Sequence, residues 1–107
     1  MEGPDDLDEA DETVRRRLAR WLAAQEIDFE TLRDALGLSP RALERELRHV
    51  ARSARREGRR LVVEAPRCRD CDFAFPGREA RHLHPPGRCP RCRTQRIAPP
   101  RFRLAPR

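Results

Sequence analysis

The first regular hydrophobic pattern in the chain runs from Thr13 to about Gln25. Its apolar residues recur at intervals of three and four, the spacing of one face of an α-helix, and the arginines fall mostly outside that face. The apolar residues of this stretch are Val14, Leu18, Trp21 and Leu22. The pattern predicts an amphipathic helix over residues 13–25.

A short second helix is predicted between Asp28 and Gly37. Asp28 can cap the free N–H groups at the helix start, and Ile27 before it can act as a hydrophobic staple. Gly37 suits the end of a helix because glycine adopts the left-handed conformation without steric cost. The apolar positions between these two residues are Phe29, Leu32, Ala35 and Leu36.

The third predicted helix is the longest and the most basic. Ser39 can cap its first N–H groups, and Pro40 suits the first helical position, where no donor is needed. Gly58 is predicted to end this helix. The apolar stripe consists of Leu43, Leu47, Val50 and Ala54, and the other faces carry Arg41, Arg45, Arg48, Arg52, Arg55 and Arg56.

A short helix, a glycine turn and a long basic helix are typical of a helix-turn-helix, whose second helix enters the DNA major groove. Arg33 departs from that pattern, because the position four residues before the turn glycine is commonly small. Its long side chain must snorkel outward, or the helix crossing must widen. Glu44 could read a cytosine edge, but pairing with Arg48 one turn later is favoured. The candidate nucleic-acid contacts are Ser39, Arg41, Arg45, Arg48, Arg52, Arg59 and Arg60.

Beyond Gly58 the hydrophobic period changes from helical to extended. Residues 59–65 contain a β-branched run, and residues 101–104 alternate between basic and apolar side chains, so both read as strands. If these strands pair, residues 66–99 form an insertion at the tip of a two-stranded wing. The predicted fold class is α+β: a three-helix winged helix-turn-helix core (residues 13–65), a zinc ribbon inserted at the wing (66–99), and a returning strand with the C-terminal tail (100–107).

All four cysteines fall in two pairs, Cys68-x2-Cys71 and Cys89-x2-Cys92, separated by a 17-residue loop. This is the spacing of a tetrahedral four-thiolate metal site, which is closed and therefore structural rather than catalytic. Two disulfides are disfavoured because the N-terminus shows no secretory hydrophobic region. His82 and His84 lie in the loop and could replace a sulfur. Zinc is favoured, and iron is possible.

The insertion has few apolar residues with which to form a core. Phe73 and Phe75 lie two positions apart, and Ile97 follows the second cysteine pair. So small a module cannot bury enough apolar surface to fold unaided, and we expect metal binding to supply much of its stability.

The charge of the chain is strongly segregated. The first 12 residues hold seven of the 18 acids and no base, which leaves 24 arginines against 11 acids in residues 13–107, a net charge of +13. Such an excess favours a polyanionic partner, and double-stranded DNA is the partner we expect. The acidic leader (residues 1–12) is predicted to be disordered, either as a solubilising tail or folded back over the basic surface.

At 107 residues and 37% hydrophobic content, the chain can bury only a small core. No apolar run approaches the roughly 20 residues of a membrane span, so a cytoplasmic protein is expected. We find no glycine-rich phosphate loop and no Ser/His/Asp constellation, and an enzyme is not predicted.

Similar residues occur in small prokaryotic predicted transcriptional regulators that join a winged helix-turn-helix to a rubredoxin-like zinc ribbon, and this chain resembles that family over residues 13–104. The matching stretches are residues 49–53, 58–64, 68–75, 86–93 and 100–104. The resemblance implies zinc at Cys68, Cys71, Cys89 and Cys92 and a DNA-binding role. This chain departs from the ribbon pattern at Asp72, where glycine in a left-handed conformation is usual; aspartate tolerates that conformation better than most residues.

Three functions remain open. The first is a DNA-binding transcriptional regulator whose arginines neutralise phosphates, and a two-fold homodimer is expected for it because half-site recognition favours symmetry. The second is a zinc-ribbon module that docks onto the transcription machinery. The third and least favoured is a rubredoxin-like electron carrier with iron in the cage, because the surroundings are rich in arginine.

Overall fold

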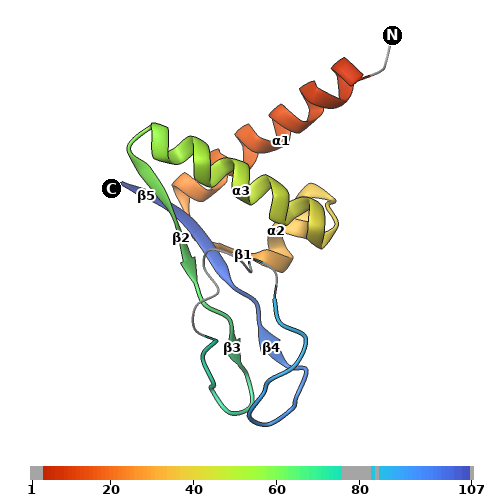
Figure 1. Ribbon diagram of the computed structural model, residues 1–107, viewed down its shortest axis with the longest axis vertical. Coiled ribbons are helices and arrows are strands. Elements are labelled where there is room, and N and C mark those ends of the chain that lie inside the picture. Colours follow the sequence, from red (N-terminus) through yellow and green to blue (C-terminus); the bar gives the residue numbers. More distant parts are fainter. Residues whose placement is uncertain (1–3, 76–82, 84, 107) are drawn as a thin grey trace.

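The computed structural model describes residues 4–75, 83 and 85–106 and shows an α+β protein. The helices gather at one end of the long axis, and a small two-stranded sheet lies at the other (Figure 1). The elements in chain order are α1 (Pro4–Ala24), β1 (Ile27–Asp28), α2 (Phe29–Leu36), α3 (Pro40–Arg56), β2 (Arg59–Glu64), β3 (Arg67–Cys68), β4 (Ile97–Ala98) and β5 (Arg101–Pro106).

Helix α1 begins well before the predicted start at Thr13. Residues 4–12 are helical, so the prediction of a disordered leader is wrong for this part of the chain. The sequence offers a physical reason, because proline is favoured in the first helical turn and acidic residues near a helix N-terminus complement its dipole. Extending a helix that already exists also avoids the cost of nucleating a new one.

The predicted caps of α2 and α3 are confirmed. Oδ1 of Asp28 accepts the N–H of Thr31 at 2.8 Å, and the hydroxyl of Ser39 accepts the N–H of Ala42 at 3.1 Å. Gly37 ends α2 with φ +66°, and its N–H donates to the carbonyl of Arg33 at 2.7 Å. These contacts satisfy helix-end groups that would otherwise lack partners.

Arg33 fits the turn by lying along it. Its Nε donates to the carbonyl of Leu38 at 3.1 Å, and its Nη1 lies 3.1 Å from Oε1 of Glu30. The side chain remains one-third exposed, so the guanidinium braces the α2–α3 turn from outside and does not enter the helix crossing. The snorkelling expected of this arginine is what the structure shows.

Three strands form the main sheet, in the order β1-β5-β2, and every pair is antiparallel. The predicted pairing of the strands that flank the insertion is confirmed, with Leu61 opposite Leu104 and Val63 opposite Phe102. Strand β1 was not predicted, because two residues show no periodicity. It adds Ile27 to the other side of Phe102.

The main core lies between the helices and the three-stranded sheet, with α1 against β5 and α3 against β2. Leu18 and Leu22 of α1, Phe29 of α2 and Phe102 of β5 are at most 1% exposed, and the rings of Phe29 and Phe102 lie 6.3 Å apart at 51°. Burying a side chain of this size contributes about 1.5–3 kcal/mol, so these contacts fix how the helices sit on the sheet. The remaining buried members are Leu32, Leu43, Leu47, Val50, Ala54, Leu83 and Leu104.

Residues 66–99, called the insertion below, leave the sheet after β2 and return to it at β5 (Figure 1). The insertion has its own apolar cluster, in which Phe75, Cys68 and Cys89 are buried and Phe73 and Ile97 pack against them. The Phe73 and Phe75 rings meet edge to face at 5.0 Å and 86°. This cluster is distinct from the main core, as expected of a small module.

Candidate metal centre and basic surface

The two cysteine pairs occupy equivalent turns. The N–H groups of Asp70 and Cys71 donate to the sulfur of Cys68 at 3.4 Å, and the N–H of Arg91 donates to the sulfur of Cys89 at 3.3 Å. These donors fix the position of each sulfur within its turn. Each turn therefore orients its first cysteine toward the facing turn.

Each turn closes through a residue with a left-handed backbone. Asp72 and Arg93 directly follow the second cysteine of their pairs, with φ of 67° and 66°, and their N–H groups donate to the carbonyls of Cys68 and Cys89 at 3.0 and 2.9 Å. The expectation for Asp72 is confirmed. The left-handed conformation of Arg93 was not predicted from the sequence, although Arg93 follows Cys92 just as Asp72 follows Cys71. A residue other than glycine costs roughly 1–2 kcal/mol in this conformation, and aspartate less than most.

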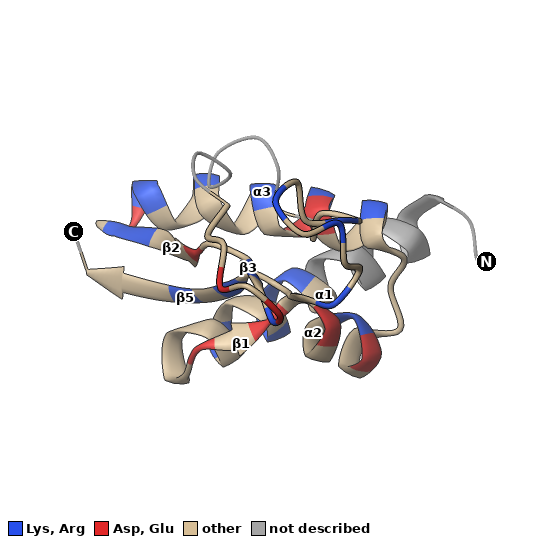
Figure 2. Cartoon of the chain, turned by 90° about the horizontal axis from the view of Figure 1, so that it is seen from below, with Lys and Arg blue, Asp and Glu red and all other residues tan. Residues whose placement is uncertain are grey.

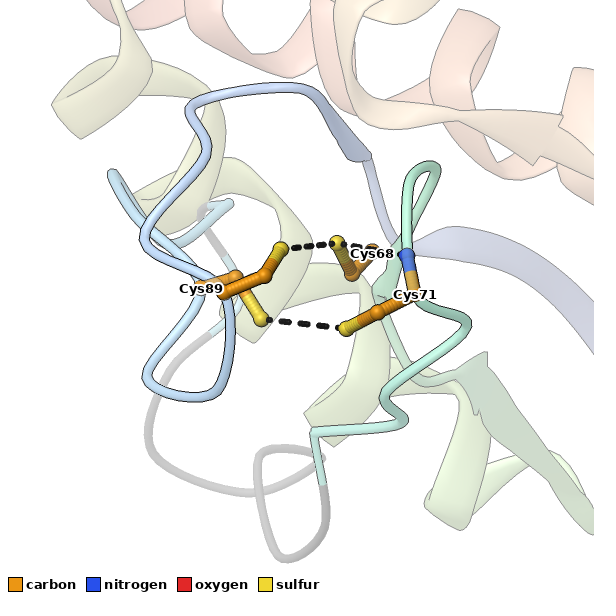
Figure 3. A group of neighbouring side chains, drawn as sticks. Cys68, Cys71 and Cys89 are labelled. Atoms are coloured by element: carbon orange, nitrogen blue, oxygen red, sulfur yellow. Dashed lines mark hydrogen bonds between the residues drawn. The ribbon is translucent and has the colours of Figure 1, made fainter.

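The four sulfurs converge from the two facing turns. Sγ of Cys68 lies 3.5 Å from Sγ of Cys92, Sγ of Cys71 lies 3.6 Å from Sγ of Cys89, and all four lie within 4.8 Å of one another. Figure 3 shows the labelled cysteines pointing toward one another across the gap between the turns.

These separations fit a bound tetrahedral ion. Four sulfurs at about 2.3 Å from zinc stand about 3.8 Å apart, whereas disulfide sulfurs stand about 2.05 Å apart. All four cysteines are free thiols, and the predicted ligands Cys68, Cys71, Cys89 and Cys92 are brought together as one set that could hold a metal ion. Because iron also accepts four thiolates, the donor set defines the geometry and not the metal. His82 and His84 lie outside the described residues.

The cysteines of the cluster differ in how readily they ionise without a metal ion. Burial would raise the pKa of Cys89, but backbone N–H groups of Cys92 and Arg91 bring it down to about 7. A backbone hydrogen bond at Thr94 acts to lower the pKa of Cys92, yet burial and the neighbouring sulfurs raise it to about 12. Burial and the sulfurs of Cys68 and Cys89 likewise raise the pKa of Cys71. A divalent ion would stabilise all four as thiolates.

An acid on the first turn links it to the second. The Thr94 hydroxyl hydrogen-bonds to the carboxylate of Asp70, and Nε of Arg96 lies 3.0 Å from Oδ1 of the same carboxylate. Both contacts hold the pKa of Asp70 below its usual value, so the acid is ionised at neutral pH. The side chains thus tie the two turns together on the outside of the cluster.

The predicted nucleic-acid contacts of α3 lie together on one surface. Arg41, Arg45, Arg48 and Arg52 are exposed, and the helical spacing places them opposite the buried stripe of α3. Figure 2 shows basic positions recurring along α3. Arg48 pairs with Glu44 at 3.4 Å, and Arg52 hydrogen-bonds to Nδ1 of His49 at 2.9 Å. The Ser39 hydroxyl is used as a helix cap, although the residue is exposed.

Arg59 and Arg60 point to opposite sides of β2, as successive strand residues must. Arg60 is exposed and lines a hollow of about 340 Å³ between α3 and β2, with Arg48, Arg52 and Arg55. Arg59 is half-buried, pairs with Glu57 at 3.1 Å, and lies on the flank toward α1. Arg60 therefore joins the α3 arginines and Arg59 does not, while Arg55 belongs with them and was not among the candidates.

Leu83, from the loop between the cysteine pairs, docks against the helical core. Its side chain is 3% exposed and belongs to the main core cluster, and its N–H donates to Oε2 of Glu44 at 3.3 Å. The same oxygen lies 3.4 Å from Nη2 of Arg48. Glu44 is thus bound within the protein by Leu83 and Arg48, and the contact fixes the insertion to α3 beside the exposed arginines of that helix. No local pattern could reveal a contact across 39 positions.

The inner flank of α3 holds a buried acid. Glu46 is 3% exposed and accepts a 2.6 Å hydrogen bond from Nε of Arg15. Burial lowers the pKa of nearby His49, and the positive charges of Arg15 and Arg52 lower it further, so this imidazole is neutral at pH 7. The closest cation to Glu46 is therefore Arg15 on α1, while Nε of Arg45 on the outward face lies farther away, 4.0 Å from Oε2.

In the part of the chain that the structure describes, the fold and the site define an α+β protein with three helices and a four-cysteine cluster in an insertion between paired strands. Residues 13–62 match a protein-family model described as PF0610-like, N-terminal. The whole architecture is similar to the solution NMR structure of protein PF0610 from Pyrococcus furiosus, with a TM-score of 0.73 and 27% sequence identity over 90% of this chain and 91% of that one. No curated protein matches this chain. Among residues 4–75, 83 and 85–106, no helix has the length and apolar composition that crossing a bilayer requires.

Proposed function

We propose that the protein is a DNA-binding transcriptional regulator in which α2 and α3 act as a helix-turn-helix and the β2–β5 pair acts as its wing. The observation that carries the proposal is the row of exposed arginines on the outward side of α3, preceded by a glycine turn and a capped N-terminus. Arginine forks match phosphates and guanine edges, and a helix of this kind presents its first turns to the major groove.

The charge balance supports the same proposal. Glu46 is turned inward to Arg15, and Glu44 is engaged by Leu83 and Arg48. Arg41 has no acidic partner among the described residues, and Arg45 is 61% exposed although its Nε lies 4.0 Å from Glu46. Exposed guanidinium groups of this kind favour phosphate contacts whose strength depends on salt. A cytoplasmic location belongs to the proposal, because free thiols persist in that reducing compartment.

We assign the four-cysteine site a structural role, with zinc as its proposed occupant. Cys68, Cys71, Cys89 and Cys92 would fill a tetrahedral coordination sphere, leaving no open position at which water could be activated. The bound ion would cross-link the two turns, and the small apolar cluster around Phe73 and Phe75 would form the rest of the core of the insertion. No catalytic activity is part of this proposal.

The test is a binding titration of the full chain, in its metal-bound form, against a labelled random-sequence duplex at several salt concentrations. Affinity should fall steeply with salt, and the double variant Arg45→Ala/Arg48→Ala should bind more weakly and reduce the log–log salt slope by about two. The matched control is Arg17→Ala/Arg20→Ala, which removes two exposed arginines from α1. An unchanged slope in the α3 variant would favour docking onto a protein partner.

A further inference from the structure

The outer surface of the insertion carries a second concentration of positive charge. Among its described residues, six exposed arginines stand against two acids, Asp70 and Asp72. Arg67 pairs with Asp72 at 3.5 Å, and Arg96 pairs with Asp70 at 3.0 Å. The arginines left without an acidic partner in the described part of the chain are Arg69, Arg88, Arg91 and Arg93.

One of these four arginines occupies an unfavourable backbone position. Arg93 has φ +66° in the turn that follows Cys92, where glycine would be free of strain. Its side chain is exposed, so burial of the side chain does not offset the backbone strain. A strained residue that offers a charged group to solvent is an observation that points toward function.

The chemistry of the surface indicates what kind of partner it fits. Of the larger apolar side chains of the described insertion, Phe73, Phe75 and Ile97 are packed around the cysteines and Leu83 is buried in the main core, so they are not gathered into an outward patch. Protein interfaces have an apolar centre, whereas contacts to a phosphate backbone need only positioned cations. Figure 2 shows arginine positions both along α3 and on the loops of the insertion.

We propose that Arg69, Arg88, Arg91 and Arg93 form a second phosphate-contact surface on the insertion, which extends the footprint on nucleic acid beyond α3. This inference rests on the proposed DNA-binding function and adds to it a contact region on the insertion, beyond the β2–β5 wing. The cysteine turns then hold a metal and also present guanidinium groups to the backbone of the duplex.

Arg93→Gly tests the inference because it separates binding from folding. In the metal-bound full chain, the substitution should raise the melting temperature by removing the strain, leave one metal per chain, and reduce the salt slope for the random-sequence duplex by about one. Asp72→Gly is the matched control: it relieves the same strain in the other turn but removes an acid, so it should raise the melting temperature without reducing the slope.

Further variants separate this inference from the proposed function. If Arg45→Ala/Arg48→Ala lowers the slope while Arg93→Gly and Arg69→Gln/Arg91→Gln leave it unchanged, the second surface is refuted and the α3 proposal stands. If the insertion variants alone lower the slope, the second surface stands and the α3 interface fails. Loss of metal from Arg93→Gly would overturn the inference, because the arginine would then serve the cysteine cluster. So would binding of polyglutamate as tightly as DNA, which would indicate an acidic protein partner.

Discussion

Nε of Arg15 on α1 lies 2.6 Å from Oε1 of Glu46 on α3, and the Glu46 side chain is 3% exposed. A carboxylate this deeply buried requires a partner, since an uncompensated charge away from water is costly. The pair joins the N-terminal helix to the helix that carries the basic surface, and Arg45 Nε stands 4.0 Å from the second oxygen of the acid.

Removing Arg15 should therefore destabilise the fold more than its partial exposure suggests. Arg15→Ala leaves Glu46 buried without its closest cation, and we expect a loss of about 3 kcal/mol in the free energy of unfolding. Urea denaturation followed by Trp21 fluorescence measures it. In Arg15→Ala/Glu46→Ala the unpaired charge is gone, so this double variant should recover part of the loss. Equal stability of Arg15→Ala and the unaltered chain would refute a buried, charged Glu46.

Leu83 should matter to the stability of the helical core, although it belongs to the insertion. Leu83→Ala removes a side chain that is 3% exposed and packed in the main cluster, and we expect a cost of about 2–3 kcal/mol. The control is Val62→Ala on β2, which is half-buried outside both clusters and should cost less than about 1 kcal/mol. Similar unfolding free energies for the two variants would show that Leu83 does not dock as described.

Acid should release the metal ion. Without metal, Cys92, with its pKa raised to about 12, and Cys71, whose pKa is also raised, hold their protons at pH 7, whereas the metal-bound cluster holds none. Lowering the pH therefore favours the metal-free state, and the stability that the metal gives the insertion is lost as pH falls. Zinc titrations from pH 6 to 8 should show affinity rising with pH and protons released on binding. An affinity independent of pH would contradict the four-thiolate site.

The elements that could be predicted from the sequence are those set by local chemistry. Asp28, Gly37 and Ser39 act at the ends of their own helices, and the spacing within each cysteine pair defines a turn by itself. The helical stripe of α3 also held a signal that was not used, because Glu46 stands three residues after Leu43, on the apolar side. A titratable residue at such a position indicates a buried ion pair.

The features that were missed depend on contacts between distant parts of the chain. The strand character of Ile27 exists only because Phe102 pairs with it, 75 positions later. Leu83 is surrounded by polar and basic sequence, and its burial follows from how the insertion folds back on α3. That Arg60 lies beside the α3 arginines and Arg59 does not could not be predicted either, because it depends on which side of β2 faces α1.

We propose that four thiolates hold one metal ion and that this ion folds the insertion onto a basic helical domain. Elemental analysis of freshly isolated, reduced full-length protein, before and after chelation, tests it most directly. We predict one zinc per chain, and on chelation a loss of protection from hydrogen exchange in residues 66–75 and 88–99 while α1 and α3 remain protected. If the metal-free chain protects those two segments as well as the metal-treated protein does, the insertion does not depend on a metal ion for its fold.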